Sequence, residues 1–439
     1  MDMRTTKPAL GFIFLTLLMD VLGFGLLIPV APRLVETILH PGSMATEAQA
    51  APYVAGLQAT FYAMSFLFAP ALGVLSDRIG RRPVILIALL GSGLDYFVMA
   101  MAPTITWLFV TRVINGLSGA TYTVASAYVA DVTPPEKRAA GYGLIGAAFG
   151  LGFVIGPIIG GVLGNHDIRL PFWVAGGMTM VNWLYGMFIL PESLPRELRT
   201  PFSLKRANPV GAYFALGRYP LVLGMAISLF LLNMAQFALH ATWALSMQHR
   251  FEWTPLKIGL SLMVVGLGAA IVQGGLARRL IPALGEKRSL MFGLLMGTLA
   301  YIGYGAATHG WMIYTIIAIA SIGAIGQPAG QALISKEVLP TEQGLVQGAL
   351  ASLNSLAGII GPIIGGLTFA YFAKNPPPFP GAPINLAGAN FYVSAFLCVL
   401  STIAAAWAVR HHVERRGQAT AYRSANEATV GVGDVPIRK

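Results

Sequence analysis

Charged residues are scarce in this sequence. Aspartate, glutamate, lysine and arginine make up 11% of its 439 residues, whereas a soluble globular protein carries about 25%. Apolar residues make up 55%, and they are gathered into long runs. The composition therefore argues against a soluble enzyme and predicts a polytopic membrane protein.

Cysteine is almost lacking, because the only one is Cys398, inside an apolar run. This excludes a disulfide within the chain, a CxxC redox pair and a cysteine-based metal site, and it is typical of a small buried hydrophobic residue. No phosphate-binding loop of the form GxxxxGKS or GxxxxGKT occurs, so ATP is not the expected energy source. The net charge of +11 is spread over short loops, so no nucleic-acid-binding domain is expected.

Twelve segments are long and apolar enough to cross a bilayer, whose hydrocarbon core of about 30 Å needs roughly 20 helical residues. The first carries Asp20, Pro29 and Pro32 and lacks a small-residue cleavage site, so we expect a retained membrane anchor rather than a cleaved signal peptide. The twelve cover approximately residues 9–32, 52–75, 83–103, 105–131, 139–164, 171–191, 221–246, 257–277, 289–308, 310–334, 344–373 and 389–409.

Lysine and arginine fall mainly on one side of these spans. Arg112 lies within a span, and the few basic residues of the other side are Arg33, Arg169, Arg250, Lys257 and Lys374. Because cytoplasmic loops carry the excess of basic residues, the sequence predicts a multi-pass protein of the inner (cytoplasmic) membrane with both termini in the cytoplasm.

The chain repeats itself, since Ile155–Gly161 and Ile360–Gly366 both read IGPIIGG. Parallel six-helix halves are a recurring design of secondary transporters. We therefore expect an all-α membrane protein of twelve transmembrane helices in two pseudo-symmetric halves. The expected parts are an N-terminal half (1–191), a cytoplasmic linker (192–220), a C-terminal half (221–409) and a disordered cytoplasmic tail (410–439).

Three charged residues lie deep in predicted spans: Asp20, Asp95 and Arg112. A central aspartate costs about 2.5–3.5 kcal/mol on insertion scales, so it requires a partner or a purpose. One interpretation is a carboxylate held by Arg112 as a structural counter-ion. The other is a protonatable group that faces a central cavity and couples substrate binding to protons.

Two further patterns concern loops and helix packing. The predicted turn between the second and third spans reads GVLSDRIGRR, in which glycines allow a sharp turn and Asp77 can hold an arginine in one conformational state. Its candidate gating residues are Gly73, Asp77, Arg78, Gly80, Arg81 and Arg82. Small residues at i+4 spacing favour close helix packing; the candidates are Gly152, Gly156, Pro157 and Gly160, with Gly361 and Pro362 in the second repeat.

Polar residues inside predicted spans are candidates for a substrate cavity. Asn233, Gln236, His240 and Trp243 are spaced so that they share one helical face. The other candidates are Tyr62, Asn115, Gln327, Gln331 and Asn354. Polar residues that bridge helices explain the same pattern without any substrate, so both interpretations stay open.

These strings together resemble the major facilitator superfamily, in its twelve-helix drug:proton antiporter branch, and are most similar to bacterial tetracycline efflux proteins. The resemblance implies that Asp20, Asp95 and Arg112 lie in the transport path, that Asp77 and Arg81 form a gating pair, and that Gln273 faces the substrate cavity. The stretches that carry it are Leu18–Pro32, Gly73–Arg82, Gly91–Tyr96, Arg112–Val124 and Phe149–Gly161.

The sequence departs from the tetracycline exporters at two positions. They carry an acidic residue in the ninth span, where Gly297 stands here, and a histidine in the eighth, where Ala269 stands. We therefore expect a proton-coupled antiporter for a small amphipathic drug-like compound, with tetracycline-like compounds as one candidate. The alternative is a proton-coupled exporter or symporter of a specific metabolite.

The expected partners are a small-molecule substrate, protons and the lipid bilayer, and the protein is expected to be a monomer. No cofactor and no resident metal are expected, although a metal-chelated substrate is compatible with the resemblance. An intramembrane enzyme lacks a recognisable catalytic set, because no HExxH or GxSxG occurs. A non-transporting receptor would tolerate loss of Asp20.

Overall fold

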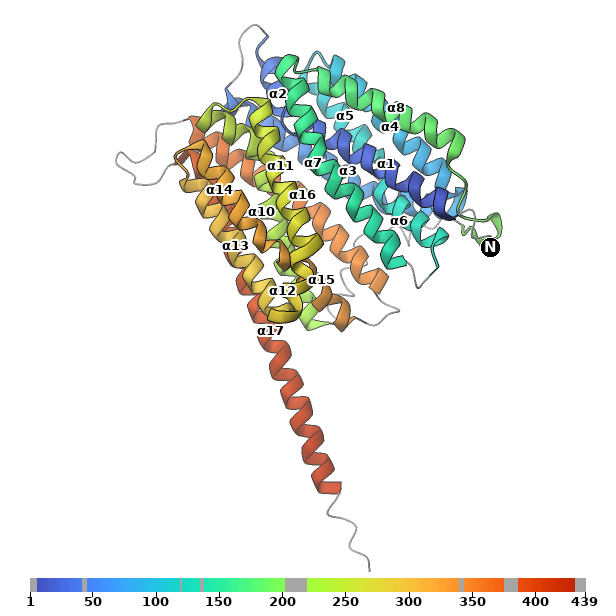
Figure 1. The fold of residues 1–439 in the computed structure, drawn as a ribbon, viewed down its shortest axis with the longest axis vertical. Coiled ribbons are helices and arrows are strands. Elements are labelled where there is room, and N and C mark those ends of the chain that lie inside the picture. Colours follow the sequence, from blue (N-terminus) through green and yellow to red (C-terminus); the bar gives the residue numbers. More distant parts are fainter. Residues whose placement is uncertain are drawn as a thin grey trace, which may run out of the picture.

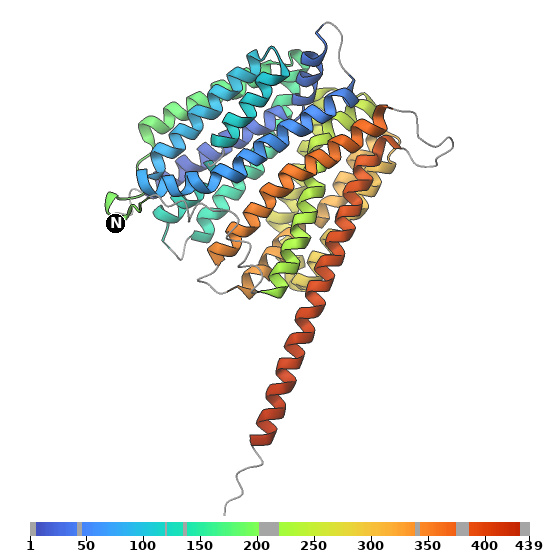
Figure 2. The same cartoon turned by 180° about the vertical axis from the view of Figure 1, so that it is seen from behind.

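The described part of the protein is a bundle of helices. The computed structural model describes residues 6–41, 46–118, 121–134, 138–201, 219–338, 343–374 and 386–430, and these contain no strand. Figures 1 and 2 show two groups of helices, blue to green for the N-terminal half and yellow-green to red for the C-terminal half.

The described part of the N-terminal half contains eight α-helices. Its longest helix begins with a capping box between Thr46 and Gln49, which satisfies free backbone amides of the first turn. The helices are α1 (Thr6–Leu27), α2 (Ala31–Leu39), α3 (Glu47–Ile79), α4 (Arg81–Met101), α5 (Ile105–Ser118), α6 (Thr121–Val132), α7 (Arg138–His166) and α8 (Leu170–Ile189), followed by the short η2 (Arg196–Leu198).

The C-terminal half is built in the same way. Two of its spans are interrupted. A π-helical turn, η3, divides one span into α11 and α12, and a 3-10 turn, η4, divides another into α14 and α15. The elements are α10 (Pro220–Phe251), α11 (Pro255–Ile271), η3 (Val272–Leu276), α12 (Ala277–Leu284), α13 (Glu286–Ala306), α14 (Gly310–Ala320), η4 (Ser321–Ile325), α15 (Gly326–Glu337), α16 (Gln343–Lys374), η5 (Leu386–Gly388) and α17 (Ala389–Val430).

Ten helices within the described residues are long and apolar enough to cross a membrane. They match ten of the twelve predicted spans. The fourth predicted span corresponds to α5 and α6, and the sixth to α8. The first span is shorter than predicted, because the helix ends at Leu27 and a turn at residues 28–30 leads into the unpredicted α2. Pro29 and Pro32 explain this ending, since proline lacks the amide hydrogen that a continuing helix needs.

The prediction of a disordered tail from residue 410 is wrong for most of that tail. Helix α17 continues without a break to Val430 and extends beyond the bundle (Figure 1). The segment 411–430 contains four alanines, three arginines, two glutamates and one glutamine and no proline, and these four residue types favour helix. Residues 431–439 lie outside the described part of the chain.

The repeated IGPIIGG strings pack in equivalent ways in the two halves. A Cβ on Gly156 would lie 2.9 Å from the Cα of Gly25 in α1, and one on Gly361 would lie 2.6 Å from a carbonyl oxygen of α10. The last glycine of each string faces the opposite half. A Cβ on Gly161 would lie 2.6 Å from the Pro255 carbonyl oxygen in α11, and one on Gly366 would lie 3.0 Å from a carbonyl oxygen of α3. The two strings therefore make corresponding contacts in the two halves.

The other candidate packing residues belong to the same contacts. Gly152 and Gly160 face Val21 and Leu26 of α1 across the α1–α7 interface. The backbone oxygen of Pro157 contacts Gly259 of α11. Pro362 is buried in α16. Small residues at these positions let helix backbones approach closely.

The two halves meet at one end of the bundle, here called the junction end. Leu245, Phe369 and Ala370 of the C-terminal half belong to the same hydrophobic cluster as Leu34 of α2 and Val54 of α3. Toward the opposite end, which carries both chain termini, the halves diverge (Figures 1 and 2). The glycines on the helix segments there, such as 143, 146 and 150 of α7 and 274 and 275 of η3, face open space, because a Cβ on any of them would meet no neighbouring helix within 4 Å.

Candidate functional site

A buried polar cluster lies between α4 and α5 of the N-terminal half. The side chain of Asp95 is fully buried, and its Oδ2 accepts hydrogen bonds from Arg112 Nη2 at 3.0 Å and from Asn115 Nδ2 at 2.7 Å. Asp95 Oδ1 is buried without a hydrogen-bond partner among the described residues. The cluster thus joins two of the three predicted intramembrane charges in an ion pair, as the counter-ion interpretation requires, and leaves one acceptor position of the carboxylate free.

Asp20 lies apart from this ion pair. It is half-buried on α1 and forms no hydrogen bond or ion pair with the described residues. Tyr96 connects the two regions: a Cβ on Gly23, one turn after Asp20, would lie 3.1 Å from the Tyr96 hydroxyl. Tyr96 is itself buried and directly follows Asp95 in α4. Tyr96 is therefore a candidate site residue that the sequence did not single out.

Aromatic side chains occupy the division between the two halves. The ring of Tyr62 on α3 packs against Phe237 on α10, with centroids 4.7 Å apart. His240, one turn further along α10, lies 6.4 Å from the ring of Phe153 on α7 and 6.2 Å from Phe237. Gln236 lies within 3.5 Å of the His240 ring through their Nε2 atoms. These residues of both halves line one region at the division.

The remaining cavity candidates are not all brought together. Trp243 is a correction: it is 3% exposed and packs in the core of the C-terminal half against Tyr304 and Phe391, with its indole nitrogen donating to Ser261. Trp243 shares the helical face of Gln236, seven positions earlier, but at its level of α10 this face is covered by the packed helices that carry Ser261, Tyr304 and Phe391. Among the others, Asn233 and Asn354 are half-buried, and the exposed ones are Gln273, Gln327 and Gln331.

The predicted gating residues lie at the turn between α3 and α4, and Arg81 is at their centre. Its guanidinium forms ion pairs with Asp77 at 2.6 Å and Asp131 at 3.1 Å, and Nη1 donates to Ser76 Oγ at 2.5 Å. Ser193 Oγ also donates to Asp131 at 3.0 Å. All these partners belong to the N-terminal half or the chain directly after it. The turn is therefore held to its own half in this conformation.

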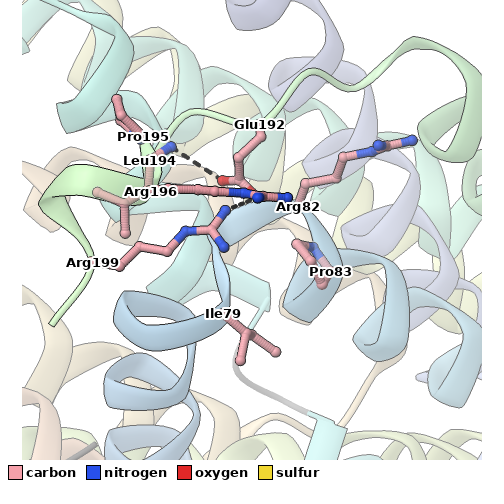
Figure 3. Close-up of a pocket in the computed structure, with 8 residues that line it drawn as sticks. All are labelled: Ile79, Arg82, Pro83, Glu192, Leu194, Pro195, Arg196 and Arg199. Carbon is pink, nitrogen blue, oxygen red and sulfur yellow. Dashed lines mark hydrogen bonds and ion pairs between the residues drawn. The ribbon is translucent and has the colours of Figure 1, made fainter. Parts of the chain in front are cut away.

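The neighbouring residues of the turn attach it to the last turn of α8 and to the segment after α8. Arg82 donates to the Met187 carbonyl oxygen at 2.6 Å, whereas Arg78 is exposed and Gly73 packs normally near Thr123. Figure 3 shows Glu192 between the turn and this segment. Glu192 Oε1 accepts from the backbone amides of Arg81 at 2.8 Å and Leu194 at 3.1 Å.

A hollow of about 520 Å³ lies beside this attachment, lined by Ile79, Arg82, Pro83, Glu192, Leu194, Pro195, Arg196 and Arg199. Gly80 has a φ of +110°, which side-chain-bearing residues rarely adopt. A Cβ on Gly80 would clash with the Glu192 carboxylate. Glycine is therefore required here for both conformation and space.

No group of three or more histidine, cysteine, aspartate or glutamate side chains that could hold a metal ion occurs among the described residues. The buried cluster itself consists of a carboxylate, a guanidinium and an amide. Asp131 and Glu192 join Tyr96 as site residues that sequence reasoning missed. Their signal was weak, because acidic residues at span ends are common and nothing local shows which arginine they meet.

A bundle of membrane-spanning helices in two pseudo-symmetric halves, with polar residues buried between apolar helices, is a design that many secondary transporters share. The comparison with known families specifies which kind. The Major Facilitator Superfamily model matches residues 13–324 and 276–433, and the chain belongs to this family.

The chain is similar to several bacterial proteins. The tetracycline resistance protein of class C from Escherichia coli is 38% identical over 369 residues, which cover 84% of this chain and 91% of that protein. The class E protein from Escherichia coli is 35% identical over 399 residues, which cover 90% and 94%. The class H protein from Pasteurella multocida is 34% identical, with 82% and 88% covered.

Solved structures show the same fold. The human organic anion transporter MFSD10 (TETRAN) has a TM-score of 0.66 at 26% identity, covering 91% of this chain and 99% of that one. A bacterial homologue of the human lysosomal transporter Spinster, in an inward-facing and occupied conformation, has a TM-score of 0.74 at 16% identity, covering 93% and 98%.

Proposed function

We propose that this protein is a proton-coupled antiporter that exports a small amphipathic drug-like compound across the inner membrane by alternating access. The observation that carries the proposal is the Asp95–Arg112–Asn115 cluster, buried inside a transporter fold whose relatives are tetracycline resistance proteins. These relatives favour an exporter over a metabolite symporter.

The cluster provides a way to couple protons to the movement of helices. A proton on Asp95 weakens its ion pair with Arg112, and the guanidinium becomes available to another acceptor. The free Oδ1 of Asp95 is the position at which such a proton is held. Asp20, half-buried on α1 one turn before the glycine that faces Tyr96, is a second carboxylate for the same path.

The energy of one proton is sufficient for drug export. A membrane potential of 100 mV contributes about 2.3 kcal/mol per charge, and one pH unit contributes about 1.4 kcal/mol. One inward proton therefore sustains a substrate ratio on the order of tens- to hundreds-fold.

We assign the junction end to the extracytoplasmic side, because the basic loops and both termini lie at the other end. Contacts between the halves at the junction end, and their divergence at the opposite end, correspond to an inward-facing conformation. The Tyr62–Phe237 contact and the glycine contacts of Gly161 and Gly366 must then separate for the outward-facing conformation to form.

The substrate is proposed as drug-like in class rather than as tetracycline alone. Gly297, where the tetracycline exporters have an acidic residue, lies beside α17: a Cβ there would be 3.5 Å from Cys398 Sγ. Ala269 provides no imidazole in α11. A metal-chelated substrate would accordingly lack two of the side chains that the exporters present to it.

Everted membrane vesicles with an acidified lumen test the proposal. A pH-sensitive dye reports alkalinisation of the lumen when a drug from a panel that includes magnesium-tetracycline is added. We expect drug-triggered alkalinisation with the wild type and its loss in Asp20→Asn and Asp95→Asn. Glu197→Gln, an exposed acid outside the spans, is the matched control and retains the signal. Antiport that persists in Asp95→Asn would refute the role of the cluster, and silence of the wild type across the panel would refute drug export.

A further inference from the structure

A second polar cluster lies at the junction end, in the helix that the sequence did not predict. Gln248 on α10 of the C-terminal half reaches across to α2 and α3 of the N-terminal half. Its Nε2 donates to Glu36 Oε2 and to Glu47 Oε1, both at 3.0 Å, and its Oε1 accepts from Arg33 Nε at 3.1 Å. One amide thus makes three hydrogen bonds to the other half.

The orientation of this amide is determined by its partners. Both carboxylates accept hydrogen bonds and the guanidinium only donates them, so Nε2 must face Glu36 and Glu47 while Oε1 faces Arg33. These bonds break when the halves separate at the junction end, because α10 moves with the C-terminal half. The cluster therefore forms only when this end is closed.

Glu36 has an unbalanced environment within the cluster. It is 0% exposed, and its Oε1 is buried without a hydrogen-bond partner among the described residues. The other charged or titratable groups that face it are Arg33 on its own helix, Glu47 on α3 and His249 on α10, which approaches Glu47 at 3.4 Å. Two carboxylates share one neutral amide, and Arg33 is bonded to the amide oxygen rather than to Glu36.

Burial, and secondarily the neighbouring Glu47 charge, raise the pKa of Glu36 from 4.5 to about 7, although the Gln248 hydrogen bond and Arg33 act in the opposite direction. A group at this pKa changes protonation within the range of external pH that a cell meets. α2 lies outside the membrane-spanning segments, so the group can exchange protons with the extracytoplasmic water when the junction end opens.

We propose that Glu36 is a proton-binding site of the extracytoplasmic gate, and that a proton on it stabilises the closed gate by neutralising the carboxylate that Gln248 shares with Glu47. This assignment rests on the proposed orientation and function and goes beyond them, since it adds a proton site outside the buried Asp95 cluster.

The direction of the effect follows from linkage. Glu36 has a higher pKa in the closed state than in the open state. Protonation of Glu36 therefore stabilises the closed state fully at pH values below its open-state pKa, and this stabilisation is lost as the pH rises through about 7. With a pKa of about 7 when closed and the ordinary 4.5 when open, the ratio of closed to open molecules rises about 70-fold between pH 8 and pH 5.

This direction suits an antiporter that imports protons. After the drug leaves to the outside, the open gate exposes Glu36 to the acidic extracytoplasmic side. A proton that binds there favours closure and hence the return to the inward-facing state. Deprotonation removes this bias, so the gate opens more readily when the outside is alkaline.

Spin-label distances in lipid nanodiscs, without drug, test the inference independently of transport. Cysteines replace Asn165 and Thr308, which are exposed at the junction end of α7 and in the turn between α13 and α14, and Cys398 is changed to serine. We expect a short-distance population that grows from pH 8 to pH 5. In Glu36→Gln, which resembles the protonated side chain, the short population is high at both pH values.

Two further variants separate Glu36 from its neighbours. Glu47→Gln removes the like charge that faces Glu36, so the midpoint of the wild-type response shifts to lower pH. His249→Gln leaves the response in place. A Glu36→Gln response equal to that of the wild type, a response abolished by His249→Gln, or a wild type with no pH response overturns the inference. Because no drug is present, any of these results leaves the drug-triggered alkalinisation in vesicles as a separate question.

Discussion

The Asp95–Arg112 ion pair allows a quantitative test of how the N-terminal half is held together. Replacement of Arg112 by glutamine removes the charged partner of a carboxylate whose side chain is 0% exposed. Asn115 remains as its hydrogen-bond donor at 2.7 Å, but a neutral amide does not balance the charge. Asp95 must then stay buried and unpaired or take up a proton.

The expected magnitudes come from the burial of the pair. Loss of one partner of a buried ion pair costs about 3–5 kcal/mol of unfolding free energy, so Arg112→Gln is strongly destabilising. Asp95→Asn costs less, because the Arg112 side chain is 14% exposed and a long side chain can reach water. The double variant retains neither charge of this pair, so it should be more stable than Arg112→Gln, with a coupling energy on the order of 2 kcal/mol.

A double-mutant cycle in bicelles, followed by steric trapping or reversible denaturation, measures this coupling. The matched control is the Asp95–Asn115 cycle with Asn115→Ala, because it removes a hydrogen bond to the same carboxylate from a donor without charge, and hydrogen bonds between membrane helices average about 0.6 kcal/mol. The reasoning is refuted if the two cycles give equal coupling energies, or if the double variant is no more stable than Arg112→Gln. Transport should be absent in the double variant even where stability recovers.

The remaining predictions concern two glycines. Gly160→Ala should destabilise the protein by about 1–3 kcal/mol, because the new Cβ would lie 2.7 Å from the Cα of Leu26. Thermal unfolding tests this, with Gly150→Ala on the same helix as the control, because a Cβ on Gly150 would face open space. Equal melting temperatures of the two variants would contradict the prediction. Gly80→Ala should lower the free energy of unfolding by about 1–3 kcal/mol and reduce transport, because φ is +110° and the Cβ would displace the Glu192 carboxylate. Unchanged stability and an unchanged alkalinisation signal in vesicles would show that the turn tolerates a side chain.

Much of the architecture could be predicted because bilayer physics leaves strong signals. Long apolar runs marked the spans. The two IGPIIGG strings marked the repeat, because glycines spaced one turn apart lie on one face of a helix and let another helix pack closely against that face. The Asp95–Arg112 pair was accessible as one of two interpretations, because a charge inside a span must meet a partner. Which partner it meets depends on two helices and required the structure.

Other features carried no comparable local signal. Helix α2 has nine residues between two spans. The first span was predicted to run to residue 32, so only the first two residues of α2 fell within it and residues 33–39 were assigned to no helix. Trp243 was assigned to a polar face from spacing alone, although the neighbouring helices decide which face is buried. The helical course of residues 411–430 reflects intrinsic propensity, which a low apolar content concealed.

The locations of the two polar clusters, one around Asp95 and one around Glu36, imply different roles in one transport cycle. Asp95, Arg112 and Asn115 all belong to α4 and α5, so a rigid rotation of the halves leaves their mutual distances unchanged. A proton at Asp95 can influence the rotation only through other helices, for which Tyr96 and α1 provide the contact. Glu36 differs because its partner Gln248 belongs to the opposite half, so the rotation itself makes and breaks the bond. The buried cluster around Asp95 is accordingly suited to carrying the coupled proton. The cluster around Glu36 at the junction end is suited to setting the pH at which the gate closes.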